Sequence, residues 1–158
     1  MKIGIISDTH DNLINLEKIV KIFNEDLKID FLIHCGDVCS PFAINILSKL
    51  KCDYVGVFGN NDGEWLGIQK LSKGRFFKPP LLRNISGVKF AIMHEGDLAE
   101  YIDEKVDFVL FGHTHNSYLK KKGRQTIINP GTLSGYVSGK STYAIIDLTD
   151  MKSEILEL

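Results

Sequence analysis

The chain has 158 residues and a formal net charge of −1. This length fits one domain, and the charge lacks the basic excess that phosphate-mediated nucleic-acid binding requires. A hydrophobic fraction of 44% and a charged fraction of 25% are ordinary for a globular protein. We therefore expect a single domain over residues 1–158, for which nucleic acid is not an expected partner.

The three cysteines, Cys35, Cys39 and Cys52, are an odd number without the spacing of a disulfide framework. Free thiols in a reducing cytoplasm are the simplest interpretation, with all three as small core residues. The apolar runs are far shorter than the roughly 18 residues that a membrane-spanning helix needs. The opening residues lead into a predicted strand without a signal-peptide pattern. We therefore expect a cytoplasmic protein with no membrane partner.

The first half of the chain alternates predicted strands and helices. Short apolar runs predict strands at residues 2–6, 30–34 and 53–58. Helical spacing of apolar residues predicts one helix capped by Asp11 or Asn12, and a second one capped by Ser40 with Pro41 at its first position. Alternation of this kind favours parallel strand pairing.

The second half is richer in predicted strands. Residues 64–78 are expected to form a partial helix or a loop, because Gly67 and Gly74 interrupt them, and Pro79–Pro80 ends the segment. A short helix is expected around residues 98–104. Three hairpins are predicted, formed by residues 81–85 with 88–93, 118–121 with 125–128, and 142–148 with 152–158. One further strand is predicted at residues 107–111.

Side chains that can bind metal ions follow the predicted strands of both halves. In chain order they are Asp8, His10, Asp37, Asn60, His94, His113 and His115. Open α/β sheets keep ligands at the carboxyl ends of their strands, so we expect these side chains to converge. Imidazole and carboxylate donors suit divalent Zn, Mn, Fe, Co or Ni. Seven donors exceed the four of a tetrahedral ion, which indicates two ions that share a carboxylate.

A pair of such ions would hold a phosphoryl group for in-line attack and lower the pKa of a bound water toward neutrality. Each strand end read alone has an ordinary explanation as a capping Asp or a turn. His113 and His115 are the stronger pair, because alternate strand residues point to the same side. The joint occurrence at five strand ends carries the argument. His34 lies inside a strand and is interpreted as a packed residue, or else as one that supports the ligands.

Five motifs resemble those of the calcineurin-like metallophosphoesterases. They are Asp8-Thr9-His10, Gly36-Asp37, Gly59-Asn60-Asn61-Asp62, His94 at a strand end, and Gly112-His113-Thr114-His115. The compact length, the Gly-Asn-Asn-Asp loop and residues 129–132 are similar to the small prokaryotic phosphodiesterase branch. The resemblance implies an α/β (α+β) fold, built as a four-layer α-β-β-α sandwich with its site at the carboxyl edge of the sheets.

The resemblance also implies the ligand sets and the reaction. One ion would be held by Asp8, His10, Asp37 and His115, and the other by Asp37, Asn60, His94 and His113, with Asp37 bridging. Two divalent ions, manganese or nickel by preference and zinc, iron or cobalt otherwise, would support hydrolysis of a small phosphodiester by a metal-bridging hydroxide. The alternatives are a phosphomonoesterase acting on a small phosphorylated metabolite or nucleotide, and a non-catalytic scaffold with the same fold.

Asn61 departs from many relatives, which carry His directly after the ligand Asn. An amide cannot donate a proton to a leaving alkoxide as His does, although it can hydrogen-bond a phosphoryl oxygen. We therefore count Asn61 with Asp37 and His94 among the catalytic residues, and expect substrates with good leaving groups to be favoured. The alternative is that Asn61 only shapes its turn.

A second departure is found where many relatives read His-Gly-His. Here Glu95 and Asp97 follow His94; they would disfavour highly anionic substrates near the site, or simply cap an exposed helix. Two apolar pairs, Trp65–Leu66 and Tyr136–Val137, could mark the surface of a homodimer or higher homo-oligomer. Burial in the core is the preferred interpretation for both pairs.

Overall fold

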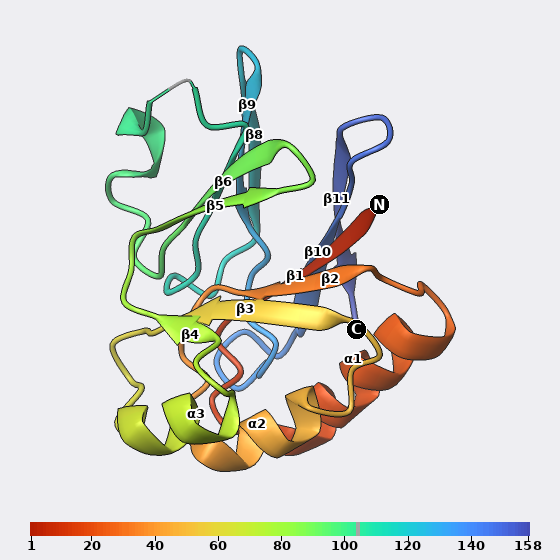
Figure 1. Cartoon of the computed structure of the whole chain (residues 1–158), viewed down its shortest axis with the longest axis vertical. Helices are drawn as coiled ribbons and strands as arrows, with labels where there is room; N and C mark the ends of the chain where they lie inside the picture. The colour runs from red at the N-terminus through yellow and green to blue at the C-terminus, as the bar shows by residue number, and fades with distance from the viewer. Residues whose placement is uncertain (104) are drawn as a thin grey trace.

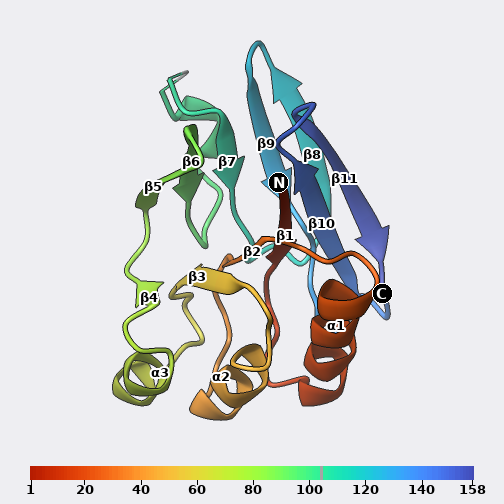
Figure 2. The same ribbon diagram turned by 45° about the vertical axis from the view of Figure 1, so that its right-hand side comes forward.

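The computed structural model of the protein describes residues 1–103 and 105–158. Its elements in chain order are β1 (Lys2–Ile6), α1 (Leu13–Glu25), β2 (Phe31–His34), α2 (Pro41–Leu47), β3 (Asp53–Val57), α3 (Trp65–Leu71), β4 (Phe76–Phe77), β5 (Leu81–Ile85), β6 (Val88–Ile92), the 3-10 helix η1 (Ala99–Tyr101), β7 (Phe108–Leu110), β8 (Tyr118–Lys122), β9 (Gln125–Asn129), β10 (Thr142–Asp147) and β11 (Lys152–Glu157). Two sheets pack face to face, and α1, α2 and α3 cover the outer face of the first sheet (Figures 1 and 2). The predicted α/β fold class is confirmed.

The first sheet has six strands in the order β11-β10-β1-β2-β3-β4. β1, β2 and β3 pair in parallel, with Ile5 opposite Ile33 and Ile33 opposite Val55. β10 and β11 complete the sheet as an antiparallel hairpin beside β1. Because β1, β2 and β3 run in one direction, the loops that follow them emerge at one edge of the sheet, as predicted.

The second sheet has five strands in the order β5-β6-β7-β9-β8. The three inner strands β6, β7 and β9 are parallel, and the edge strands β5 and β8 pair antiparallel to their neighbours. The three predicted hairpins are all present, as β5–β6, β8–β9 and β10–β11. The third of them belongs to the first sheet, which its sequence alone does not reveal.

Alternate residues of the first sheet face two different cores. Ile6 and Leu32 pack with the buried faces of α1 and α2. Ile5 and Ile33 pack instead against side chains of the second sheet such as Phe90. Both faces of β1 and β2 are therefore covered, which explains why these strands are unbroken apolar runs.

The first two helices begin where the sequence predicts. Asn12 caps α1, because its side chain accepts a hydrogen bond from the Asn15 N–H at 3.1 Å. Ser40 precedes Pro41 at the start of α2, but its side chain makes no capping hydrogen bond. The Ser40 hydroxyl donates instead to the Asp11 carboxylate at 2.7 Å, so it joins the loop after β1 to the start of α2.

Two segments in the middle of the chain differ from expectation: residues 64–78 contain more regular secondary structure than predicted, and residues 98–103 contain less. Residues 64–78 contain the two-turn helix α3 and the short strand β4, which extends the first sheet. The helix expected around residues 98–104 is only the 3-10 helix Ala99–Tyr101, and residue 104 lies outside the described residues. The outer layer on the second sheet is therefore thin, built from η1 and the adjoining chain that packs on Val109 and Ile127.

The preference for burial of the two apolar pairs was wrong. Leu66 is 88% exposed, Val137 80% and Tyr136 67%, while Trp65 is 37% exposed. The reason for the first pair is that α3 spans only seven residues and buries Ile68 alone. No helix within the described residues is long and apolar enough to cross a membrane.

Candidate metal centre

The seven predicted ligand residues come together where the loops of the two sheets meet. Asp8 and His10 follow β1, Asp37 follows β2, Asn60 follows β3, His94 follows β6, and His113 and His115 follow β7. Asp8, Asp37 and His94 are buried, whereas the other four side chains reach the surface at least in part. The carboxylates therefore form the floor of the centre, and most of the imidazoles form its rim.

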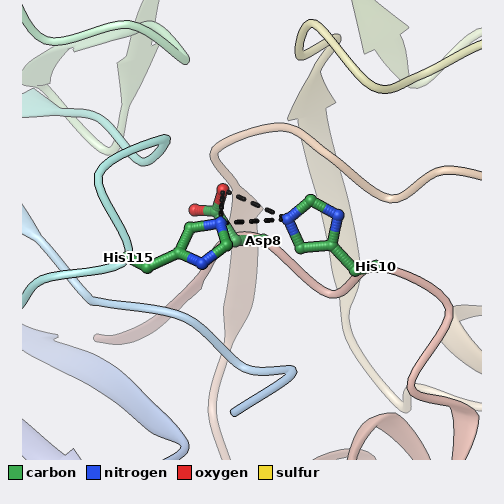
Figure 3. Close-up of side chains that lie close together, drawn as sticks. All are labelled: Asp8, His10 and His115. Carbon is green, nitrogen blue, oxygen red and sulfur yellow. Dashed lines mark hydrogen bonds and ion pairs between the residues drawn. The ribbon is translucent and has the colours of Figure 1, made fainter. Parts of the chain in front are cut away.

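Asp8, His10 and His115 form the first donor cluster (Figure 3). The Nε2 atoms of His10 and His115 are 3.1 Å apart, and Asp8 Oδ1 lies 3.8 Å and 3.3 Å from them. Asp8 Oδ2 accepts a hydrogen bond from the His113 backbone N–H at 3.0 Å. The buried Oδ1 atom has no such partner within the described part of the chain. An unpartnered buried carboxylate oxygen beside two imidazole nitrogens fits a cation bound among them.

Asp37, Asn60, His94 and His113 form the second donor cluster. Asn60 Oδ1 lies 3.0 Å from His94 Nε2 and 2.9 Å from His113 Nδ1. His94 Nδ1 donates to the Cys35 carbonyl at 2.8 Å, which leaves the lone pair of Nε2 facing oxygen acceptors when the ring is neutral. Lone pairs directed at one another in this way also fit a divalent cation.

Asp37 connects the two donor clusters. Its Oδ2 atom lies 3.6 Å from His10 Nε2 and 3.4 Å from His94 Nε2. The Asn61 backbone N–H donates to Asp37 Oδ1 and the Asn61 side-chain amide donates to Oδ2, both at 2.8 Å. The structure thus places the Asn61 amide on Asp37, and its predicted contact with a phosphoryl group stays a prediction.

The surroundings of Asp37 keep its carboxylate ionised. Burial raises the pKa of Asp37, but hydrogen bonds from the protonated His94 ring and from Asn61 outweigh burial and hold that pKa well below its usual range. The hydrogen bond with Asp8 raises the pKa of His10. Burial lowers the pKa of His94, yet its interactions with Asp37 leave that pKa above the ordinary value. A strongly negative site of this kind attracts cations.

Most of the predicted ligands have a strained backbone. Five of the seven adopt a positive φ, namely Asp8 (52°), His10 (43°), Asp37 (59°), His113 (66°) and His115 (60°). Asp and His tolerate this left-handed region better than most residues, but each instance costs on the order of 1 kcal/mol or more. Such conformations persist only where the surroundings hold them, and three buried side chains do so here.

Asp62 is the first of these supports. Its carboxylate accepts hydrogen bonds from the backbone N–H groups of Asp37, Cys39 and Gly59, at 3.2, 2.6 and 2.7 Å. It therefore ties the loop after β2 to the loop after β3. Burial raises the pKa of Asp62. The sequence motif contains this residue, but its role depends on contacts that the motif does not state.

Asn129 supports the loop of the second sheet, and sequence reasoning gave it no role beyond the resemblance. Its side-chain amide donates to the Gly112 carbonyl at 2.8 Å and to Thr114 Oγ1 at 3.0 Å, and its Oδ1 accepts from the Gly131 N–H at 2.9 Å. Thr132 then donates from Oγ1 to the Asp8 carbonyl at 2.9 Å. The end of β9 and the loop that follows it thereby hold the loop that carries His115 and the loop that carries Asp8.

His34 is buried, as expected, and it also contacts the ligand loops. Its Nδ1 accepts a hydrogen bond from the Gly36 N–H at 3.1 Å. The ring proton therefore lies on Nε2, which donates to Thr9 Oγ1 at 2.6 Å. Burial lowers the pKa of His34 to about 4. Gly36 itself has a φ of +99°, and a Cβ atom there would lie 2.5 Å from His94 Nδ1, so only glycine fits.

The cysteines only partly match the expected core positions. All three thiols are free, as predicted, and Cys35 is buried. Cys52 is half-buried, and Cys39 lies beside the centre with its Sγ atom 3.5 Å from His10 Nδ1. Cys39 was therefore wrongly interpreted as a core residue, because its positive φ of 70° and its bond to Asp62 hold it at the site.

The chain is similar to known proteins over nearly its whole length. Residues 1–151 match the family model of the calcineurin-like phosphoesterase superfamily domain. The chain is 35% identical to a phosphodiesterase of Methanocaldococcus jannaschii over 93% of each protein. The solved structure of an archaeal phosphodiesterase matches with a TM-score of 0.92 and 33% identity, and both chains are covered completely. Vacuolar protein sorting 29 of Cryptosporidium parvum matches with a TM-score of 0.68 over 99% of this chain and 96% of its own, but at 19% identity this likeness shows the fold alone.

Proposed function

Because this chain belongs to the calcineurin-like phosphoesterase superfamily, we propose that it is a phosphodiesterase that uses two divalent metal ions. The observation that carries the proposal is the position of Asp37 Oδ2, which lies 3.6 Å from His10 Nε2 and 3.4 Å from His94 Nε2. One carboxylate oxygen within reach of both donor clusters is what two ions with a shared ligand require. The likeness to the M. jannaschii phosphodiesterase supports a diester substrate.

We assign the first ion to the first donor cluster with Asp37, and the second ion to the second donor cluster, with manganese or nickel as the preferred metal. Two ions bound there would supply a water that loses its proton near neutral pH and positive charge opposite the phosphoryl oxygens. Asp37 is suited to the shared position because its low pKa keeps it ionised at every working pH.

The other residues of the chain orient these ligands and set the substrate preference. The Cys35 carbonyl fixes the Nδ1 proton of His94, so that Nε2 faces the centre. Cys39 Sγ is placed to do the same for His10. Asn61 is exposed beside Asp37 and its amide can turn to a phosphoryl oxygen, but it cannot protonate a departing alkoxide. Esters with good leaving groups are therefore the favoured substrates.

The test uses purified protein that is stripped with a chelator and reloaded with manganese, nickel, zinc or cobalt. We expect faster hydrolysis of bis-p-nitrophenyl phosphate than of p-nitrophenyl phosphate, and two bound ions per chain at saturation. A preference for the monoester would favour the phosphomonoesterase alternative, and no hydrolysis with any metal would favour the non-catalytic scaffold.

Substitution of Asp37 tests the shared ligand directly. Asp37→Ala should lower kcat by more than about 100-fold, since even residues that only orient a ligand contribute 10–100-fold. The bound metal should fall below two ions per chain, while the circular dichroism spectrum stays unchanged. A variant that kept most of its activity, or a wild-type protein that saturated with one ion, would overturn the proposal.

A further inference from the structure

A cavity of about 720 Å³ adjoins the second donor cluster. Asn60 and His94 line one end of it, so the cavity is continuous with the proposed metal centre. Its other walls are mostly apolar and come from separate parts of the chain: the end of β3 with the start of α3, the segment after β4, and the chain between β6 and β7. The phosphodiesterase reaction proposed above does not by itself use these walls.

Trp65 is the main aromatic surface of this cavity. Its ring stacks on the buried Phe58 ring, with centroids 4.4 Å apart and an interplanar angle of 12°. The indole nevertheless remains 37% exposed. Lys78 Nζ lies 5.3 Å from the Trp65 ring centroid and the Lys78 side chain is exposed, so a flat ring that stacks on this face would take the place of the ammonium. An indole held rigidly on one face and accessible elsewhere is suited to stacking with a flat ring.

The charges that line the cavity restrict what else it can bind. Glu95 and Asp97 are exposed acidic residues of the lining, and Lys78 is its lysine. A ligand with further phosphate groups would meet net negative charge here, whereas an uncharged ring would not. Leu98, 67% exposed, adds apolar surface to the same cavity.

We propose that this cavity holds one ester arm of the substrate, and that the arm is a flat, uncharged aromatic group such as a nucleobase or an aryl ring. The inference rests on the proposed function, because it places the phosphoryl group of the same molecule at the adjoining metal centre. The enzyme then prefers diesters with an aromatic arm over purely alkyl diesters. Trp65 supplies the stacking surface, and Glu95 and Asp97 select against arms that end in phosphate.

The first experiment measures binding without any reaction. Trp65 is the only tryptophan of the chain, so its fluorescence reports on this cavity alone. In chelator-treated protein, adenosine should quench the indole emission saturably, because nucleobases stack on aromatic side chains. Leu98→Ala should weaken the apparent affinity several-fold, and Leu66→Ala, an exposed neighbour on α3 outside the lining, should not change it. Absence of saturable quenching, or an equal affinity in Leu98→Ala, would overturn the inference.

The second experiment measures turnover with two diesters that share the p-nitrophenyl leaving group, thymidine 5′-(p-nitrophenyl phosphate) and methyl p-nitrophenyl phosphate. Trp65→Ala should raise KM for the thymidine ester about tenfold, as expected for loss of one stacking partner, with kcat nearly unchanged. A KM increase of the same size for both esters would place the nitrophenyl ring in the cavity, which is still an aromatic arm. An unchanged KM for both would overturn the inference.

The two experiments separate this inference from the proposed function. Wild-type protein that binds adenosine but cleaves neither diester with any metal would contradict the phosphodiesterase proposal and leave the cavity assignment standing. Wild-type protein that cleaves both diesters but shows no adenosine quenching would contradict the cavity assignment alone.

Discussion

The ligand loops of the two sheets are held by different kinds of buried side chain. In the first sheet, the Asp62 carboxylate accepts three backbone N–H groups from the loops after β2 and β3. In the second sheet, the neutral amide of Asn129 holds the loop after β7. A charged acceptor forms stronger hydrogen bonds than a neutral group. Asp62, the stronger support, thus holds the loop of the buried Asp37, whose backbone is strained. Asn129, the weaker support, holds the loop that carries imidazoles of the rim.

The largest effect should follow from removing the charged support. Asp62→Ala leaves three N–H groups without their acceptor, so we expect the free energy of unfolding to fall by about 4 kcal/mol. Chemical denaturation of chelator-treated protein measures it. Asp62→Asn keeps one acceptor oxygen and should lose less, and Asp26→Ala, an exposed carboxylate on the end of α1, should change stability by less than about 0.5 kcal/mol. A loss of under about 1 kcal/mol in Asp62→Ala would contradict the charged support.

His34, at the end of β2 in the first sheet, adds a pH dependence to the stability of the protein. Its folded-state pKa of about 4 lies below the ordinary value of 6.5. Above pH 6.5 the ring is neutral in both states, and between pH 6.5 and 4 only the unfolded chain takes up the proton. Stability should therefore fall by about 3 kcal/mol as the pH drops through this window.

The measurement compares wild type with His34→Gln, since the titration of the other histidines is common to both. Unfolding free energies of chelator-treated protein at pH 7 and pH 4.5 should differ more in wild type than in the variant. The same pH dependence in both proteins would show that His34 is not the group that titrates.

Asn129→Ala removes the neutral support and should have a smaller effect than Asp62→Ala. We expect a loss of about 2 kcal/mol in unfolding free energy, because the bonds to Gly112, Thr114 and Gly131 join neutral groups. Metal affinity should fall 10–100-fold as His113 and His115 lose their orientation. Asn116→Ala, an exposed amide near the same loop, is the matched control. If Asn129→Ala lowered the unfolding free energy as much as Asp62→Ala, the two supports would be equally strong, which would contradict the comparison of the two sheets.

The sequence predicts which side chains gather at the centre better than it predicts what holds them there. Asp8, Asp37 and Asn60 each follow an apolar run, so local pattern and parallel pairing suffice to bring them together. The support by Asn129 joins residues far apart in the chain, and no local pattern records a hydrogen bond of that kind. The burial of Trp65 was mispredicted for a related reason. Apolar character states that a side chain can be buried, whereas the length of α3 decides whether it is.

Asn61 lies on the exposed side of the firmly held loop, so its replacement should affect the rate more than the fold. Asn61→His would place a proton donor beside Asp37, and we expect kcat for an alkyl diester to rise about tenfold relative to the p-nitrophenyl diester, which is less than the roughly 100-fold or more that a well-placed general acid contributes. Stability should change by less than about 0.5 kcal/mol. The comparison requires rates for both esters with the same metal.

Asn61→Ala separates the two roles considered for this residue. Alanine keeps the backbone N–H that donates to Asp37 Oδ1 but lacks the amide that donates to Oδ2. If the side chain orients Asp37 or a phosphoryl oxygen, Asn61→Ala should lower kcat/KM for the aryl diester several-fold. Unchanged kinetics would mean that residue 61 acts through its backbone alone and only shapes the turn after Asn60.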